Sequence, residues 1–472
     1  MNAIVDVVDQ FTALLWGWPL LILIVGGGLL ISIRTHFFQV RHAGFIMKQT
    51  IGSIFKKANN GEGTVSAFQA MTTALASSIG AANIVVAPTI IFTAGPGAIF
   101  WMWVAAMIGQ STKFAEVALS IKYREKNEVG EYVGGASYTL KNGLKGTFGK
   151  VMGALVAFFF MIEILPSITL QTLSAVGPMV NVGSEFGFDP HIVKYVAIGL
   201  IFILTALVVY GGVKSIGRTT EKLVPFMALL YIVFGLIVIV RYIQDVPEAF
   251  RYIFVGAFNP KAIAGGFAGA TLRNVIEAGV ARGVYSSEAG MGSAGYGHAA
   301  ATTDHPARQG LWGCFEVIAD TVVLTISTLV VVLGEVWKPT MTPKELTATA
   351  PVAVERAFNT IFGTFGSIIL SISLVLFVLS TIIVIVFYCE KQAEYLWGTH
   401  VGYVFRVIAT LMIIMGAFVS FDNAGSFLDL TLGLVVIPNM IGLILMSGEV
   451  AEMERDFFGQ EKYYPGIPEK KK

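Results

Sequence analysis

Long runs of apolar residues, separated by short polar turns, follow one another along almost the whole chain. A helix needs about 20 predominantly apolar residues to cross a lipid bilayer. Eleven segments approach or exceed this length: 13–33, 66–92, 97–120, 151–180, 193–211, 223–243, 260–286, 309–334, 357–388, 402–418 and 423–446. The pattern therefore predicts an all-α integral membrane protein with about 11 transmembrane helices.

The polar connections between these segments are too short to form a soluble domain. We therefore expect one membrane domain over 1–472, with 13–33 as an extra N-terminal helix and 447–472 as a cytoplasmic tail. The first apolar run lacks the basic residues that begin a signal peptide, so it is predicted to be a retained membrane helix.

The composition agrees with a membrane protein and excludes several other classes. Of the 472 residues, 55% are hydrophobic and 13% are charged, whereas soluble domains carry about 25% charged residues. The formal net charge of +1 leaves no basic surplus for binding nucleic acid. Both cysteines, Cys314 and Cys389, lie in apolar segments, which argues against a disulfide framework or a cysteine metal site.

Lysine and arginine are concentrated in alternate loops. They are frequent in 34–57, 122–150 and 214–222 but absent from 181–192. Because positively charged loops of membrane proteins stay on the cytoplasmic side, the N-terminus is predicted to lie outside and the C-terminus inside. The expected location is the plasma or inner membrane of the cell.

Two apolar segments are interrupted by small residues. One contains ASSIGAAN at 76–83, followed by Pro88, and the other contains GGFAGA at 265–270. Small residues alone favour close helix packing. If the first helix is set aside, however, these segments are the first and sixth of ten. This placement is typical of two inverted five-helix repeats with discontinuous helices, here 66–243 and 260–446.

A helix broken at the midplane leaves backbone groups that need a partner. Its amides suit a carboxylate and its carbonyls suit a small cation, so the two breaks favour a site for a zwitterion and a cation. Asn83 could contribute a neutral amide there, or it could bridge two helices. Gln171, five residues after the helix-disrupting Pro166, leaves the same two alternatives.

Several other polar residues lie within apolar segments. Ser380 and Thr381 could supply oxygen ligands to a cation, but hydrogen bonding to preceding carbonyls is the simpler explanation. Lys113 and Glu116 are spaced to pair with each other, as are Arg273 and Glu277. The remaining ionisable candidates are Arg282, Asp320 and Glu163, of which Glu163 has no local basic partner.

Motifs of soluble enzymes are missing or out of context. The sequence has no metal-type histidine pair on one helix, no nucleophile elbow and no phosphate-binding loop. The glycine spacing at 290–295 resembles a dinucleotide fingerprint, but it follows a membrane segment instead of a strand. We therefore expect a protein that is not an enzyme.

Longer motifs resemble the alanine or glycine:cation symporter family over the whole length of the chain. They are GPGAIFWMW at 95–103 with TKFAE at 112–116, ARGVYSSEAGMGSA at 281–294, TDHPARQG at 303–310, and EKQAEYL at 390–396. The resemblance implies the leucine-transporter-type fold with one extra N-terminal helix. It also implies sodium-driven symport of a small neutral amino acid, typically alanine or glycine, by alternating access.

The resemblance further implies residue roles. Sodium would bind to carbonyls of Ala76, Ile79 and Phe377 and to hydroxyls of Ser380 and Thr381. The substrate carboxylate would bind at the first break, and the whole substrate site would comprise Ala81, Ala82, Asn83, Gln171, Gly266, Phe267, Gly269, Ala270, Thr381 and Ile385.

The chain departs from the family pattern within this predicted pocket. It has Gly80-Ala81-Ala82-Asn83 for Gly-Thr-Gly-Asn, Leu173 where an asparagine is usual, and Ile385 where a tryptophan is usual. These changes predict a roomier, more apolar pocket that accepts a larger neutral amino acid than alanine. The alternatives are proton coupling, a cation channel, for which no filter sequence is present, and a transceptor. The expected partners are the amino acid and the lipid bilayer, and a monomer is expected.

Overall fold

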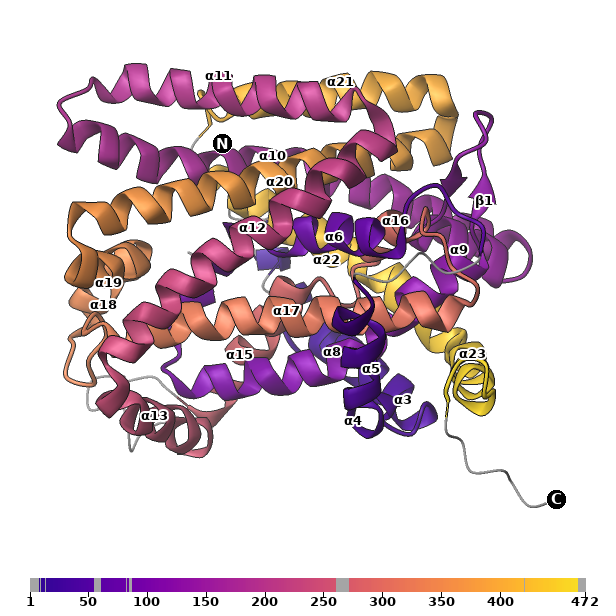
Figure 1. Ribbon diagram of the computed structural model, residues 1–472, viewed down its shortest axis with the longest axis horizontal. Helices are drawn as coiled ribbons and strands as arrows, with labels where there is room; N and C mark the ends of the chain where they lie inside the picture. Colours follow the sequence, from indigo (N-terminus) through magenta and orange to yellow (C-terminus); the bar gives the residue numbers. More distant parts are fainter. Residues whose placement is uncertain are drawn as a thin grey trace.

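The computed structural model describes residues 8–465 apart from 9, 13, 55–60, 82, 85–86, 260–270 and 420. These residues form long helices that run side by side through the molecule, with short helices at both ends (Figure 1). The long helices are α8 (Gly97–Lys122), α10 (Gly146–Glu185), α11 (Pro190–Val209), α12 (Gly212–Arg241), α15 (Leu272–Ser287), α17 (Pro306–Leu333), α20 (Thr364–Trp397), α21 (Thr399–Met415) and α22 (Phe421–Leu445).

Shorter elements connect them. At the N-terminus are α2 (Trp18–Leu21), η1 (Ile22–Gly26), α3 (Gly27–Arg34), α4 (Phe38–Arg41), α5 (Ala43–Gln49) and η2 (Ile51–Ser53). The others are α6 (Ala67–Ser78), η4 (Ala87–Thr89), α7 (Ile90–Thr93), α9 (Ala136–Gly143), η5 (Ile243–Asp245), α13 (Val246–Phe258), α16 (Ala294–His298), α18 (Pro343–Thr349), η6 (Ala350–Val352), α19 (Ala353–Phe362) and α23 (Ser447–Gly459). A small hairpin pairs β1 (Glu125–Lys126) with β2 (Tyr132–Val133) in antiparallel register, Glu125 opposite Val133.

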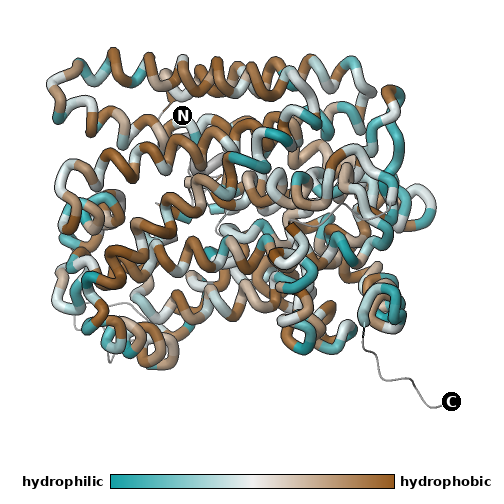
Figure 2. The backbone as a smooth tube through the Cα atoms, in the orientation of Figure 1, coloured by the Kyte–Doolittle hydropathy of each residue, from teal (hydrophilic) through white to brown (hydrophobic). Residues whose placement is uncertain are grey.

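Six helices of the described chain are long and apolar enough to cross a membrane: α10, α11, α12, α17, α20 and the part of α22 from Leu428 to Leu445. Large apolar side chains such as Leu207, Leu229 and Val240 are exposed on them, as expected of a surface that faces lipid. Hydrophilic residues gather at the ends of the helices, above all around α9, β1 and α23 (Figure 2). The prediction of a multi-pass membrane protein is confirmed.

One predicted segment, 357–388, does not start where the apolar pattern placed it. Its first residues belong to α19, and Gly363 separates α19 from α20 with a positive φ of 57°. Residues that carry a side chain rarely adopt this left-handed backbone conformation, whereas glycine does so at little cost. The glycine therefore turns the chain, and α20 continues to Trp397, beyond the predicted end.

The predicted interruption of the segment 66–92 is confirmed. A capping box between Ser66 and Gln69 starts α6, which ends at Ser78. Ile79 leaves the helical conformation, with φ −85° and ψ 86°, and a bend at Ile79 and Gly80 precedes the next helical residue, Ala81. The other predicted interruption, 265–270, lies outside the described residues.

Glycine allows α15 to approach α8 closely. A Cβ atom at Gly279 would lie 2.4 Å from the carbonyl oxygen of Ala98, and one at Gly283 would lie 3.0 Å from that of Met102. Close approach through small residues is the usual way in which membrane helices gain packing energy. It brings the C-terminal end of α15 next to the broken end of α6, where the candidate site lies.

Candidate functional site

A small cavity of about 50 Å³ lies in the centre of the helix bundle, beside the end of α6. Its walls come from α6, α10, α15, α20 and α22; in Figure 1, α6 and α22 lie near the centre, α10 and α20 above them and α15 below. The lining residues are Ser77, Ser78, Phe160, Glu163, Ser167, Gln171, Tyr285, Glu288, Met291, Ser293, Thr381, Ile385, Tyr388 and Leu432. A narrow cavity at a helix break, with hydroxyl, amide and carboxylate groups among its apolar walls, has the chemistry of a binding site for small ions and polar groups.

One wall of the cavity joins α20 to α6 through oxygen atoms. The hydroxyl of Thr381 donates to the carbonyl oxygen of Ala76 at 2.8 Å and to that of Phe377 at 2.9 Å. Ala76 is near the end of α6, where the last carbonyls have no partner within the helix. The Thr381 hydroxyl thus contacts one carbonyl oxygen from each of two helices, and these three neutral oxygens form a donor set that suits a small hard cation.

The neighbouring hydroxyl, of Ser380, has a different environment. It donates to the carbonyl oxygen of Phe377 at 2.8 Å and lies 3.3 Å from the sulfur of Met227 on α12. Its contacts are therefore the back-bonding expected from sequence, together with a contact across to α12. Ile79, whose carbonyl was predicted to bind the ion, is the residue at which α6 loses its helical geometry.

The amide of Gln171 on α10 meets the break itself. Its side-chain oxygen accepts a hydrogen bond from the backbone N–H of Ala81 at 3.4 Å. A Cβ atom at Gly80 would lie 3.1 Å both from the side-chain nitrogen of Gln171 and from the hydroxyl of Thr381. The backbone at Gly80 is thus pressed between two of the predicted site residues, and there is little room for a side chain.

Asn83 turns toward other helices. Its amide nitrogen donates to Ser286 of α15 at 3.0 Å and to the carboxylate of Asp320 on α17, while its side-chain oxygen is buried without a hydrogen bond among the described residues. Ser286 also donates to Asp320 at 2.9 Å. Asn83 therefore bridges α15 and α17, with one acceptor left open.

The prediction that Lys113 pairs with Glu116 is wrong. The ammonium of Lys113 forms an ion pair with Glu316 on α17 at 2.9 Å. Glu116 instead accepts hydrogen bonds from the backbone N–H groups of Gly290 and Gly292, both at 2.9 Å. The two side chains point toward different neighbours of α8, so the packing of the helices and not the spacing along one of them selects the partners. The predicted pair Arg273–Glu277 is confirmed, with its atoms 2.8 Å apart.

The sequence model of the sodium:alanine symporter family matches residues 1–470 of the chain. The chain belongs to the sodium:alanine symporter family. Members of this family are cation-coupled amino-acid transporters, and the prediction that the chain is not an enzyme is confirmed.

Two relatives in the sodium:alanine symporter family show the extent of the match. A transporter named YflA from Bacillus subtilis is 43% identical, over 97% of this chain and 94% of its own length. The sodium/alanine symporter AgcS from Methanococcus maripaludis is 38% identical, over 96% of this chain and 97% of its own length. The similarity therefore extends through both halves of the bundle.

Among solved structures, MhsT in complex with L-phenylalanine resembles this family member with a TM-score of 0.55. The sequences are 16% identical, and the superposition covers 83% of this chain and 98% of MhsT. At this identity the likeness establishes the fold, which is of the leucine-transporter type. The division into two five-helix repeats stays a prediction.

The structure brings together several residues that the sequence predicted for the site in this family. Gln171, Thr381 and Ile385 line one cavity, with Ala81 bonded to Gln171. Ser380 and Asn83 are not among its lining residues. Ala82, Gly266, Phe267, Gly269 and Ala270 lie outside the described residues.

Several cavity residues were not among the sequence candidates: Ser77, Ser78, Tyr285, Glu288, Ser293 and Tyr388. Glu288 was overlooked because it lies just beyond the predicted end of the segment 260–286. A carboxylate in a run of glycine, serine and alanine, directly after an apolar segment, would have been a usable signal.

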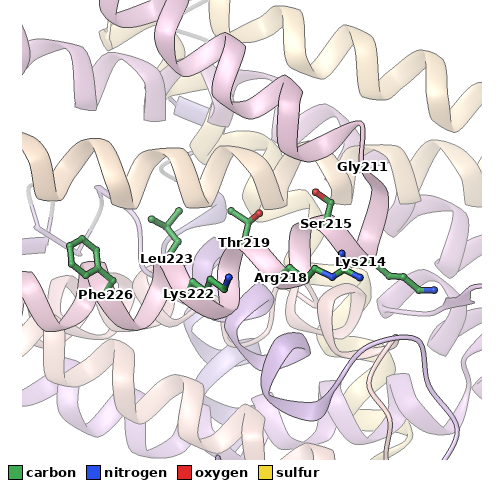
Figure 3. A pocket seen from close by; sticks show the side chains of 8 residues that line it. All are labelled: Gly211, Lys214, Ser215, Arg218, Thr219, Lys222, Leu223 and Phe226. Carbon is green, nitrogen blue, oxygen red and sulfur yellow. The ribbon is translucent and has the colours of Figure 1, made fainter.

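A second hollow, of about 760 Å³, lies away from this site along the N-terminal half of α12. Lys214, Arg218 and Lys222 follow one another along it, with Phe226 further on (Figure 3). The spacing of four residues keeps these basic side chains on one stripe of the helix. The hollow is an external, positively charged surface and is separate from the cavity at the broken helix.

Proposed function

We propose that this member of the family couples sodium influx to the uptake of a small neutral amino acid by alternating access. The observation that carries the proposal is the contact of the Thr381 hydroxyl with the carbonyl oxygen of Ala76, at 2.8 Å across two helices. Sodium would bind there, between Ala76, Ile79 and Phe377 carbonyls and the hydroxyls of Thr381 and Ser380. When sodium is bound, its contacts with these oxygens would replace the hydrogen bonds that the Thr381 hydroxyl makes without the ion.

The amino acid would bind at the break of α6, next to this ion. Backbone amides at Ala81 and Ala82, the open acceptor and amide of Asn83, and the amide of Gln171 offer partners for a carboxylate and an ammonium group. Gly266, Phe267, Gly269 and Ala270, which lie outside the described residues, would complete the substrate site. The carboxylate and ammonium of an amino acid cancel to zero net charge, so the substrate needs no buried counter-charge. This agrees with the neutral groups at this end of the cavity.

The apolar part of the substrate would face Ile385. This residue is buried at the cavity wall, where tryptophan is usual in similar transporters. The smaller side chain favours substrates somewhat larger than alanine. One methylene in an apolar pocket changes binding by about 1–3 kcal/mol, so preferences among neighbouring amino acids are expected to be graded.

Uptake into proteoliposomes tests this function. The purified chain should accumulate labelled alanine or a larger neutral amino acid when an inward sodium gradient is imposed. Replacing sodium with potassium or choline should abolish accumulation, whereas a protonophore should leave it unchanged. Accumulation driven by a proton gradient in sodium-free medium would contradict the proposal.

Proton coupling is the second candidate, because one specific observation favours it. Glu163 is a buried carboxylate at the cavity, with no hydrogen bond or ion pair to any described residue. Buried carboxylates inside membrane bundles are often proton carriers. The protonophore arm of the uptake experiment separates the two coupling ions.

A further inference from the structure

Glu163 differs from the other buried carboxylates of the bundle. It is 4% exposed and lines the central cavity. Glu116 accepts hydrogen bonds from two backbone N–H groups, and Glu316 forms an ion pair with Lys113. Asp320 accepts hydrogen bonds from the side chains of Asn83 and Ser286. Within the described part of the chain Glu163 has no such partner. An ionised carboxylate in this position carries a large desolvation cost unless a cation or a proton joins it.

Glu288, at the end of α15, lines the same cavity. Its carboxylate accepts hydrogen bonds from the hydroxyl groups of Ser77, with 3.2 Å between the two oxygens, and of Ser293. It is also close enough to Glu163 for the two carboxylates to interact electrostatically. Its backbone is in the left-handed region, with φ 52°. Residues other than glycine that are held in this costly backbone conformation are common at functional sites. At Glu288 this backbone conformation accompanies a second carboxylate at the cavity.

The positive charges in the surroundings do not compensate both carboxylates. Lys113 is a buried ammonium that acts on Glu288, and it already pairs with Glu316. The half-buried guanidinium of Arg282 lies 5.8 Å from the ring of Tyr285 and forms no ion pair with a described residue. His298 contacts Glu316 and not the cavity. Whenever both carboxylates are ionised, the cavity therefore has an excess of negative charge.

The hydroxyl groups of the cavity add further oxygens to those of the two carboxylates. The hydroxyl of Tyr388 lines the cavity, fully buried, and makes no hydrogen bond of standard geometry to a described residue. Carboxylate and hydroxyl oxygens are ligands for hard cations. The volume of about 50 Å³ exceeds the roughly 10–15 Å³ that a cavity needs to hold one water molecule. It has room for a small ion with bound water, and it must widen before it admits an amino acid as well.

We propose that a second sodium ion binds in this cavity, between the carboxylates of Glu163 and Glu288 and beside the Tyr388 hydroxyl. The proposal rests on the proposed function, since it adds a second ion to the one at Thr381. Both ions would contact one cavity, because Thr381 forms part of its wall. Their joint binding would neutralise the carboxylates and bring α10, α15 and α20 together around the end of α6.

Equilibrium binding of radioactive sodium to the purified full-length chain, without amino acid, tests the second site. Wild type should bind two ions per chain, and Glu163→Gln and Thr381→Ala should each bind one. Glu163→Asp, which keeps a carboxylate, should retain two. Glu185→Gln is the matched control, because it makes the same change at an exposed position of the same helix α10. Tyr388→Phe keeps the ring and should weaken one of the two binding events several-fold even if Glu163→Gln folds poorly.

The outcomes separate this inference from the proposed function. If wild type binds a single ion that Thr381→Ala abolishes and Glu163→Gln preserves, the second site is refuted and sodium coupling stands. If wild type binds no sodium, both proposals fail. If Glu163→Gln keeps wild-type sodium binding but changes the pH dependence of uptake, Glu163 carries a proton and the assignment to sodium is overturned.

Discussion

The hydroxyl of Thr381 on α20 lies 2.8 Å from the carbonyl oxygen of Ala76 on α6, although 305 residues separate the two in sequence. Each residue lies in a different predicted repeat, so this contact joins the two segments that the sequence assigns to separate repeats. It also occurs within one turn of the point at which α6 ends. An ion bound here would contact the broken helix and its neighbour at once, and its arrival or departure would therefore change how the two halves pack.

The first prediction concerns the sodium that this contact would bind. Thr381→Ala removes a hydroxyl ligand, and we expect the sodium concentration for half-maximal uptake to rise about tenfold, equivalent to about 1.4 kcal/mol. Thr328→Ala is the control, since Thr328 is fully buried but bonds only to carbonyls of its own helix. Equal sodium dependence of Thr381→Ala and wild type would remove Thr381 from the ion site.

The second prediction concerns the space at the helix break. Gly80→Ala would place a methyl group 3.1 Å from both Gln171 and Thr381, closer than ordinary contact. We expect the variant to fold but to lose most substrate and sodium binding, because two site residues must move. Gly199→Ala, on α11 with open space around it, should behave like wild type in the same uptake assay. Normal uptake by Gly80→Ala would show that ligands do not use this end of the cavity.

The third prediction separates a binding role of Asn83 from a structural one. Asn83→Leu removes the amide and leaves Asp320 with Ser286 as its donor, at a cost of about 1–3 kcal/mol in stability. We expect substrate binding to be lost while the protein still inserts into the membrane. Asn439→Leu removes another buried amide, one that bonds to Glu116 and the Gly290 carbonyl away from the cavity. Loss of binding to the same degree in both variants would make the effect one of stability.

The fourth prediction concerns specificity. Ile385→Trp fills the cavity wall with a much larger side chain, and we expect the range of competing substrates to contract toward glycine and alanine. The measurement is inhibition of uptake by glycine, alanine, valine, leucine and glutamine. Ile372→Trp, on the same helix but half exposed, should leave the order of inhibitors unchanged. The same order in Ile385→Trp would mean that this residue does not contact the substrate.

The fifth prediction concerns the buried ion pair of Lys113 and Glu316. Lys113→Met leaves Glu316 buried without its cation, and the loss of one partner of a buried pair typically costs about 3–5 kcal/mol. We expect a clear drop in the thermal unfolding temperature of the detergent-solubilised protein. Adding Glu316→Gln should restore part of it, since the uncompensated charge is then gone. No recovery in the double variant would indicate that the two residues act independently.

Much of the fold follows from local properties of the chain. The apolar runs predicted the long helices because each helix must satisfy its own backbone and present an apolar surface to lipid. The break after Ser78 was visible as a cluster of small residues before Pro88. The ends were less predictable: the left-handed glycine at 363 was hidden within an apolar run and divides α19 from α20.

The sequence by itself determined which segments are apolar and helical and where the first core helix breaks, and its motifs identified the family. Only the tertiary structure decided which polar groups meet. Lys113 and Glu116 are three residues apart, yet Lys113 binds Glu316 and Glu116 binds the backbone after α15. In the same way Glu288, beyond a predicted helix end, shares a cavity with Glu163 of α10. Spacing along one helix offers possible partners, but inside a bundle of low polarity the geometry of helix packing selects among them, because only side chains brought within a few ångströms can offset the cost of burial.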